Sequence, residues 1–169
     1  MDTQSLASTL FGAFVCACIA AAFVYQRRRV RGAWRRGMEA YARQDFAEVR
    51  QAFRYVVKKY PGWAMARRML AKGLAALGDH AQAEQELRLA AQLEPRNADG
   101  HIDLAIFLAS LARDRHEEAV ACIETALAVA PDMRAAVAAS PQLRPLHTLP
   151  KFRAIAGLPE TAIAPARLN

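Results

Sequence analysis

The chain has 169 residues, 54% of them hydrophobic and 23% charged, with a formal net charge of +7. Its three cysteines are too few for a disulfide framework or for paired metal-binding motifs, which excludes small disulfide-rich and zinc-ribbon folds. Abundant alanine and few β-branched runs favour packed helices, and the length allows one domain with additional segments.

The positive charge is concentrated in one block of the sequence. Residues 27–72 hold 14 Lys/Arg against 3 Asp/Glu, whereas residues 73–169 hold 9 against 12. The block directly follows an apolar segment. It contains no base-contacting or aromatic-interleaved motif, so no nucleic acid is expected as a partner.

An uncharged run of 20 residues, Leu6 to Tyr25, lies near the start of the chain. As a helix it is about 30 Å long, which matches the hydrocarbon core of a bilayer. Positive charges follow the run instead of preceding it, which is typical of an uncleaved anchor and not of a cleaved signal peptide. The sequence therefore predicts a transmembrane helix over residues 6–26; a helix buried in a protein core is the alternative.

Topology follows from the charge on either side of this span. The positive-inside rule places the arginine side in the cytoplasm and residues 1–5 on the other side. Composition rich in Ala and Arg suggests a bacterial genome, so we expect a single-pass protein of a bacterial inner membrane. Small residues within the span leave its self-association, or its packing on a membrane partner, as open interpretations.

A basic juxtamembrane segment, residues 27–36, comes next. We expect its arginines to contact anionic lipid head groups; contact with an acidic protein partner is the alternative. The predicted membrane-surface residues are Arg27, Arg28, Arg29, Arg31, Arg35 and Arg36.

Two prolines, Pro61 and Pro95, lie 34 residues apart, and each follows an aspartate by 16 residues. A repeat of this length indicates stacked helical hairpins, because each hairpin must cover its apolar face with a neighbour. A third proline, Pro131, follows after 36 residues, so the third copy has two inserted residues, which fall within Ala112–His116.

The pattern resembles the tetratricopeptide repeat (TPR), with copies at about 30–63, 64–97 and 98–131. The shared marks are small residues where two helices cross, a turn before the second helix, and a closing proline. The resemblance implies an all-α fold, in which the transmembrane helix precedes an α-solenoid of three hairpins over residues 30–131. A helical cap over residues 132–157 and a flexible tail over 158–169 complete the prediction.

In TPR proteins the first helix of each hairpin lines a concave, protein-binding face. Mapped by register, this face suits an extended or helical protein segment that is apolar with some acidic character. Packing of Trp34 at a membrane interface is the alternative for that residue. The predicted groove consists of Arg31, Trp34, Met38, Tyr41, Met65, Arg68, Lys72, Ile102 and Ile106.

Catalysis is not expected. The four histidines are scattered, no phosphate loop, nucleophile elbow or dinucleotide motif is present, and no cofactor or metal is indicated. The sequence predicts a membrane-anchored TPR adaptor or scaffold that assembles protein complexes at the cytoplasmic face. The alternative is a small structural subunit of a membrane complex, held mainly through its transmembrane helix.

Overall fold

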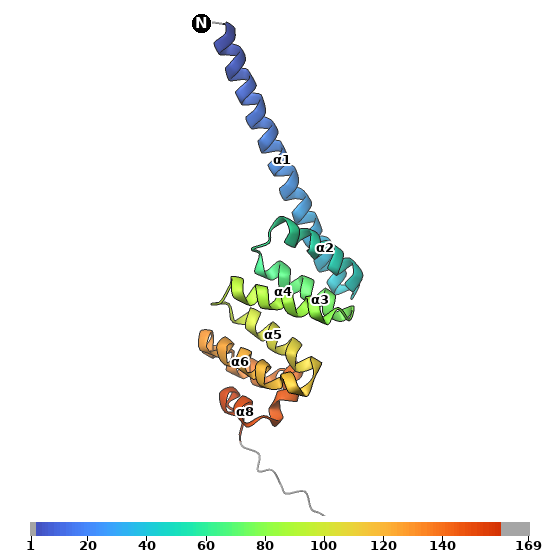
Figure 1. Cartoon of the computed structure of the whole chain (residues 1–169), viewed down its shortest axis with the longest axis vertical. Helices are drawn as coiled ribbons and strands as arrows, with labels where there is room; N and C mark the ends of the chain where they lie inside the picture. The colour runs from blue at the N-terminus through green and yellow to red at the C-terminus, as the bar shows by residue number, and fades with distance from the viewer. Residues whose placement is uncertain (1–2, 160–169) are drawn as a thin grey trace, which may run out of the picture. The chain divides into compact units, whose positions relative to one another are not determined.

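A computed structural model describes residues 3–159, with side chains from residue 14 onward. This part of the chain is built of helices and short 3-10 segments (Figure 1). It divides into two compact units, residues 1–61 and residues 62–169, which are considered separately below. The prediction of an all-helical chain made of helical hairpins is confirmed.

The first unit is the hairpin of α1 (Thr3–Ala42) and α2 (Phe46–Lys59). The two helices cross closely at Gly37, where an added Cβ would lie only 2.6 Å from Cε2 of Phe53. The Phe53 ring is fully buried and meets Trp34 edge to face, with ring centroids 5.2 Å apart. Glycine is needed at position 37 because any larger residue would displace this aromatic pair.

The second unit contains two further hairpins, in which α3 (Ala64–Ala76) packs on α4 (His80–Leu93) and α5 (Ala98–Leu111) packs on α6 (His116–Val129). Helix α5 also packs on α4. There Gly100 keeps the backbones close, since an added Cβ would lie 3.4 Å from Cα of Ala91.

The turns that open α2 and α4 are built alike. Asp45 accepts a hydrogen bond from the backbone N–H of Glu48 at 3.1 Å, and Asp79 accepts one at the equivalent position of α4 at 3.4 Å. Such N-caps satisfy backbone donors that have no partner within the helix. The residue before each aspartate has a positive φ, 60° at Gln44 and 82° at Gly78. Only the second turn has the glycine that suits this conformation.

The turn between α5 and α6 differs from both. Ala112 is extended, and Arg113–Arg115 forms the 3-10 helix η1. This is the place to which the sequence assigns the two inserted residues. Because no residue of this turn has a positive φ, the absence of glycine there causes no backbone strain.

Beyond α6 the chain folds into short helices: η2 (Pro131–Met133), α7 (Arg134–Ala139), η3 (Pro141–Thr148) and α8 (Pro150–Ala156). Leu143, Leu146 and Phe152 are fully buried. Each lies on η3 or α8, and both elements contact α6, while η3 also contacts α5. They therefore cover the apolar end of the last hairpin. Most of the predicted tail, residues 160–169, lies outside the described residues.

The transmembrane helix predicted over residues 6–26 is wrong by this structure. Over the described residues, none of the helices combines the length and the apolar character that crossing a bilayer demands. Arginines follow on the same helix from Arg27.

The location derived from that span is corrected with it. A single-pass protein of a bacterial inner membrane, with residues 1–5 outside and the repeats in the cytoplasm, is not supported. Two contacts also lose their basis: lipid head groups on the arginines and self-association of the span. The alternative function, a small structural subunit held in a membrane complex through a transmembrane helix, loses its basis as well. Residues 1–2, and the side chains of residues 3–13, are outside what the structure describes.

Candidate protein-binding surface

The predicted groove residues fall into both units. Arg31, Trp34, Met38 and Tyr41 belong to the first unit, and the other five belong to the second. Their contacts within each unit show which of them are available to a partner and which are already engaged.

In the first unit, Trp34 is half-buried against Phe53 and supports the helix crossing. Tyr41 is exposed and meets Phe46 edge to face, with ring centroids 6.3 Å apart. Met38 and Arg31 are also exposed. Trp34 is therefore largely a packing residue, whereas its three neighbours in the prediction face outward.

In the second unit, Arg68 and Lys72 of α3 converge on one carboxylate of α5. The Arg68 Nε lies 2.6 Å from Oδ2 of Asp103, and the Lys72 Nζ lies 3.3 Å from its Oδ1. Asp99 adds a second contact, 3.3 Å from Nη1 of Arg68. The Arg68 and Asp103 side chains are only 11% and 13% exposed. The two predicted basic residues thus join α3 to α5.

Apolar side chains adjoin these charges. Met65 precedes Arg68 by one helical turn and is 37% exposed, and the partly exposed Ile102 and Ile106 follow Asp99 along α5. We call this surface the α3–α5 face: Met65, Arg68, Lys72, Asp99, Ile102, Asp103 and Ile106. Its two cations and two carboxylates pair with one another, so the face is neutral. The groups that remain available to a partner are the apolar side chains.

The acidic half of the α3–α5 face was not predicted. In the sequence, Asp103 is notable only for following His101 by two residues, and side chains two residues apart on a helix do not face each other. The informative spacing was four: Arg68 and Lys72 on one helix, and Asp99 and Asp103 on another, 31 residues later. Residues four apart share a helix face, so two such pairs of opposite charge in neighbouring hairpins indicate a salt-bridge cluster.

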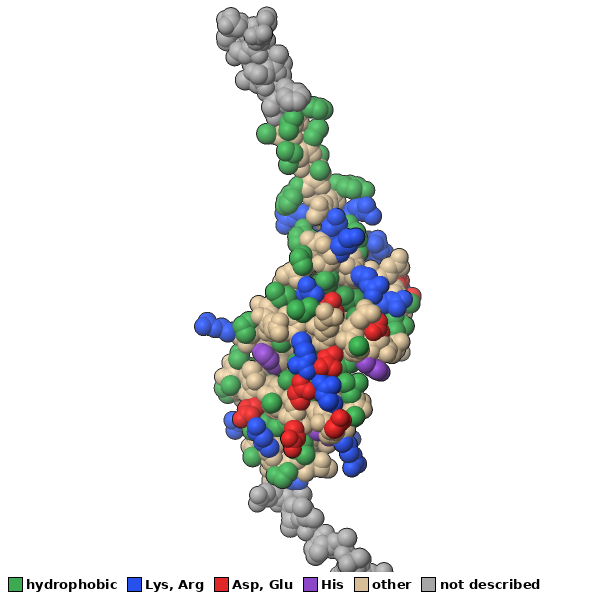
Figure 2. Space-filling view, in the orientation of Figure 1, with side chains coloured by type: hydrophobic (Ala, Val, Ile, Leu, Met, Phe, Trp, Pro, Cys, Tyr) green, Lys and Arg blue, Asp and Glu red, His purple; other side chains and the backbone are tan. Residues whose placement is uncertain are grey.

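A second charged cluster fastens η1 between α4 and α6. Arg115 Nη2 lies 2.9 Å from Oε1 of Glu84 and 2.7 Å from Oε2 of Glu118, and Arg88 pairs with both carboxylates. Hydrogen bonds from Arg115 lower the pKa of Glu84, and hydrogen bonds from Arg88 lower the pKa of Glu118. Figure 2 shows acidic and basic side chains interleaved over the second unit. We call Glu84, Arg88, Arg115 and Glu118 the charge tetrad; its ion pairs join η1 to α4 and α6.

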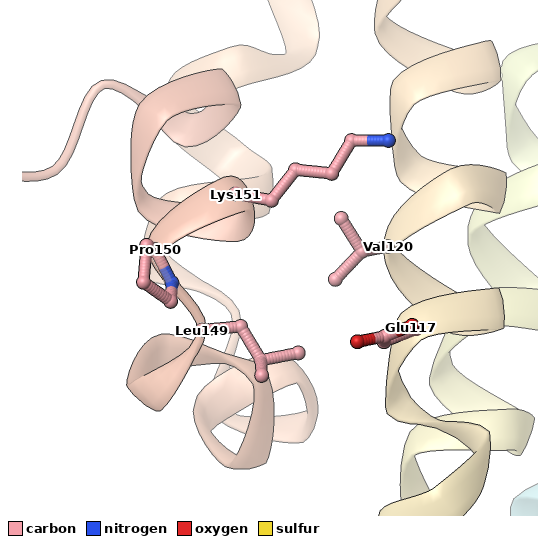
Figure 3. A pocket seen from close by; sticks show the side chains of 5 residues that line it. All are labelled: Glu117, Val120, Leu149, Pro150 and Lys151. Atoms are coloured by element: carbon pink, nitrogen blue, oxygen red, sulfur yellow. The ribbon is translucent and has the colours of Figure 1, made fainter.

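The second unit is hollowed between α6 and α8. This cavity of about 300 Å³ lies between Val120 and Glu117 of α6 on one side and Leu149, Pro150 and Lys151 on the other (Figure 3). Three of its five lining residues are apolar, and Lys151 forms an ion pair with Glu124 at 2.7 Å.

The structure brings together no metal site among the described residues, since no group of three or more His, Cys, Asp or Glu side chains converges there. Burial raises the pKa of the Cys122 thiol, which disfavours the reactive thiolate.

No protein-family model matches this chain, and no curated protein sequence matches it. A solved structure of the CopN-Scc3 complex contains a similar chain, with a TM-score of 0.52 and 22% sequence identity. The match covers 60% of this chain and 58% of that chain. At this identity the likeness concerns the fold, and it supports a fold of helical hairpin repeats.

Proposed function

We propose that this chain is an adaptor of the TPR type, which binds a segment of another protein on the α3–α5 face and does not act as an enzyme. The observation that carries the proposal is the composition of that face. Met65, Ile102 and Ile106 are partly exposed next to charges that are already neutralised within the chain.

Such a surface is suited to binding because it is rigid before the partner arrives. The ion pairs of Arg68 hold α3 against α5, so the apolar side chains stand on a fixed frame, which reduces the conformational entropy lost on association. Methionine and arginine are favoured in protein interfaces, and binding energy concentrates in a few desolvated side chains. The similar chain in the CopN-Scc3 complex was solved in a protein complex, which agrees with this role.

The partner chemistry follows from the charge of the face. Because Arg68 and Lys72 already hold carboxylates of this chain, an acidic segment would have to displace Asp103 or Asp99. An apolar segment meets no such competition. The α3–α5 face therefore selects apolar side chains, and any preference for acidic residues resides elsewhere.

The test is a fluorescence-anisotropy titration of labelled peptides that vary in apolar content, with the full chain as receptor. Ile102→Glu and Ile106→Glu place a charge on the face and should weaken binding of the best apolar peptide by about tenfold or more. Leu93→Glu is the matched control, because Leu93 is 44% exposed on α4. Equal losses in all three variants, or no binding by any peptide, would contradict the proposal.

A further inference from the structure

All of the net charge of this chain belongs to the first unit. Residues 1–61 hold 11 Lys/Arg against 4 Asp/Glu, whereas residues 62–169 hold 12 of each. Figure 2 shows basic side chains predominating over the carboxyl half of α1 and over α2. The excess of positive charge therefore lies on the hairpin of α1 and α2.

The basic side chains surround a hollow between α1 and α2. Its volume is about 450 Å³, and its lining consists of Tyr25, Arg28, Arg29, Gly32, Arg36 and Tyr55. Three of these six residues are cationic and none is acidic. We call it the arginine hollow.

The described carboxylates of the first unit, which belong to Glu39, Asp45 and Glu48, are engaged elsewhere. Glu39 lies 3.7 Å from Arg35, Glu48 lies 3.0 Å from Arg43, and Asp45 caps α2. Within the described residues, no carboxylate forms an ion pair with the arginines of the hollow. These guanidinium groups thus keep their capacity to bind an external carboxylate.

One arginine of the hollow is held in place by aromatic rings from both helices. The guanidinium carbon of Arg29 lies 5.8 Å from the Tyr25 ring centroid and 5.6 Å from the Tyr55 ring centroid. These cation–π contacts fix the side chain before any ligand binds. They also occupy the tyrosine faces on which nucleic-acid bases would stack, so the arrangement favours a protein ligand over a single-stranded nucleic acid.

Gly32 makes room at the centre of the hollow. Arg28, Gly32 and Arg36 are spaced by four residues and lie in one row on α1. A Cβ at position 32 would have only Nη1 of Arg36 near it, at 4.0 Å, so the notch is open. The two arginines are about 12 Å apart along the helix axis.

From this geometry we propose that the arginine hollow binds an acidic segment of a protein partner, with carboxylates on Arg28 and Arg36 and an apolar side chain over Gly32. In an extended peptide, residues four apart are separated by about 13 Å and residues two apart point the same way. The fitting sequence is therefore Glu-X-Leu-X-Glu. Guanidinium groups bind carboxylates through paired, charge-assisted hydrogen bonds, which gives the site its chemistry.

The inference rests on the proposed adaptor function but concerns a separate surface, so the two can fail separately. A labelled peptide containing Glu-Ser-Leu-Ser-Glu is titrated against the full chain, with Gln-Ser-Leu-Ser-Gln as the control peptide. The Glu peptide should bind about tenfold more tightly, and Arg28→Glu and Arg36→Glu should each remove about tenfold. Lys59→Glu, the same charge change on an exposed residue of the unit, should have little effect.

Gly32→Leu tests the shape of the hollow without changing its charge. Leucine favours the helix, so folding should be preserved, while its side chain fills the notch and should abolish binding of the Glu peptide. Equal effects of Arg36→Glu and Lys59→Glu, or full binding by Gly32→Leu, would overturn the inference. So would tighter binding of an oligonucleotide or of anionic vesicles than of the Glu peptide. The two proposals can be told apart. If Ile102→Glu weakens binding of the apolar peptide, while Arg28→Glu and Arg36→Glu bind the Glu peptide like wild type, the adaptor function stands and the arginine hollow is refuted.

Discussion

Replacing Arg68 by methionine should destabilise the second unit strongly, although this arginine was predicted to serve a partner. Its side chain is 11% exposed and lies 2.6 Å from Asp103, which is 13% exposed. Removing one member of a buried ion pair costs about 3–5 kcal/mol, because the remaining charge is left without compensation. Lys72 still lies 3.3 Å from Asp103. Because this second cation partly compensates for the carboxylate, we expect a loss at or just below the lower end of that range, about 2–3 kcal/mol.

Urea unfolding followed by far-ultraviolet circular dichroism measures this loss. Lys72→Met is the matched control: Lys72 is 37% exposed, so its removal should cost less than about 1 kcal/mol. The double variant Arg68→Met/Asp103→Leu removes both charges and should recover most of the stability, because apolar replacements of buried pairs are well tolerated. An Arg68→Met variant within about 0.5 kcal/mol of wild type would refute a structural role for Arg68.

Three further predictions concern packing, turns and pH. Gly37→Ala should destabilise the first unit by about 1 kcal/mol or more in urea unfolding, since its Cβ would clash with the buried Phe53 ring. Gln44→Gly should raise stability by about 0.5–1 kcal/mol by relieving a positive φ, whereas Gly78→Ala should lower it by a similar amount. Glu84→Gln should weaken the dependence of stability on pH in the acid range. The pKa of Glu84 is lowered in the folded state, so its carboxylate contributes stability above pH 4.5, its ordinary pKa, and this contribution is lost as the pH falls.

Each of these predictions has a contrary result. Alanine favours a helix interior over glycine by about 1 kcal/mol, so a Gly37→Ala variant stabilised by that amount would mean that the Phe53 ring yields without loss. Gln44→Gly should raise the free energy of unfolding and Gly78→Ala should lower it, so destabilisation by both variants would refute the strain at Gln44. Wild type and Glu84→Gln with parallel stability curves between neutral pH and pH 3 would exclude the charge tetrad as a source of acid sensitivity.

The hairpins were predictable because local signals agreed with one another. Asp45 and Asp79 cap the second helices of their hairpins, and Gly37 lies where the helices cross most closely. Each of these residues meets a steric or hydrogen-bonding need that hardly depends on the rest of the chain. The repeat spacing then placed them in register.

The prediction went wrong at the amino terminus. An uncharged run is a statement about composition, and over the described residues none of the helices is both long and apolar enough to cross a bilayer. The ion pairs were missed for a different reason. Asp103 and Arg115 acquire their roles from residues about 30 positions away, so only a comparison between repeats would have found them.

The most direct test of the adaptor function is an amide chemical-shift map of the full chain, titrated with its tightest-binding apolar peptide. The largest shift changes should fall on α3 and α5, around Met65, Ile102 and Ile106, and they should disappear in Ile102→Glu. Shift changes confined to α4, α6 or the terminal helices, with the α3–α5 face unaffected, would contradict the adaptor function.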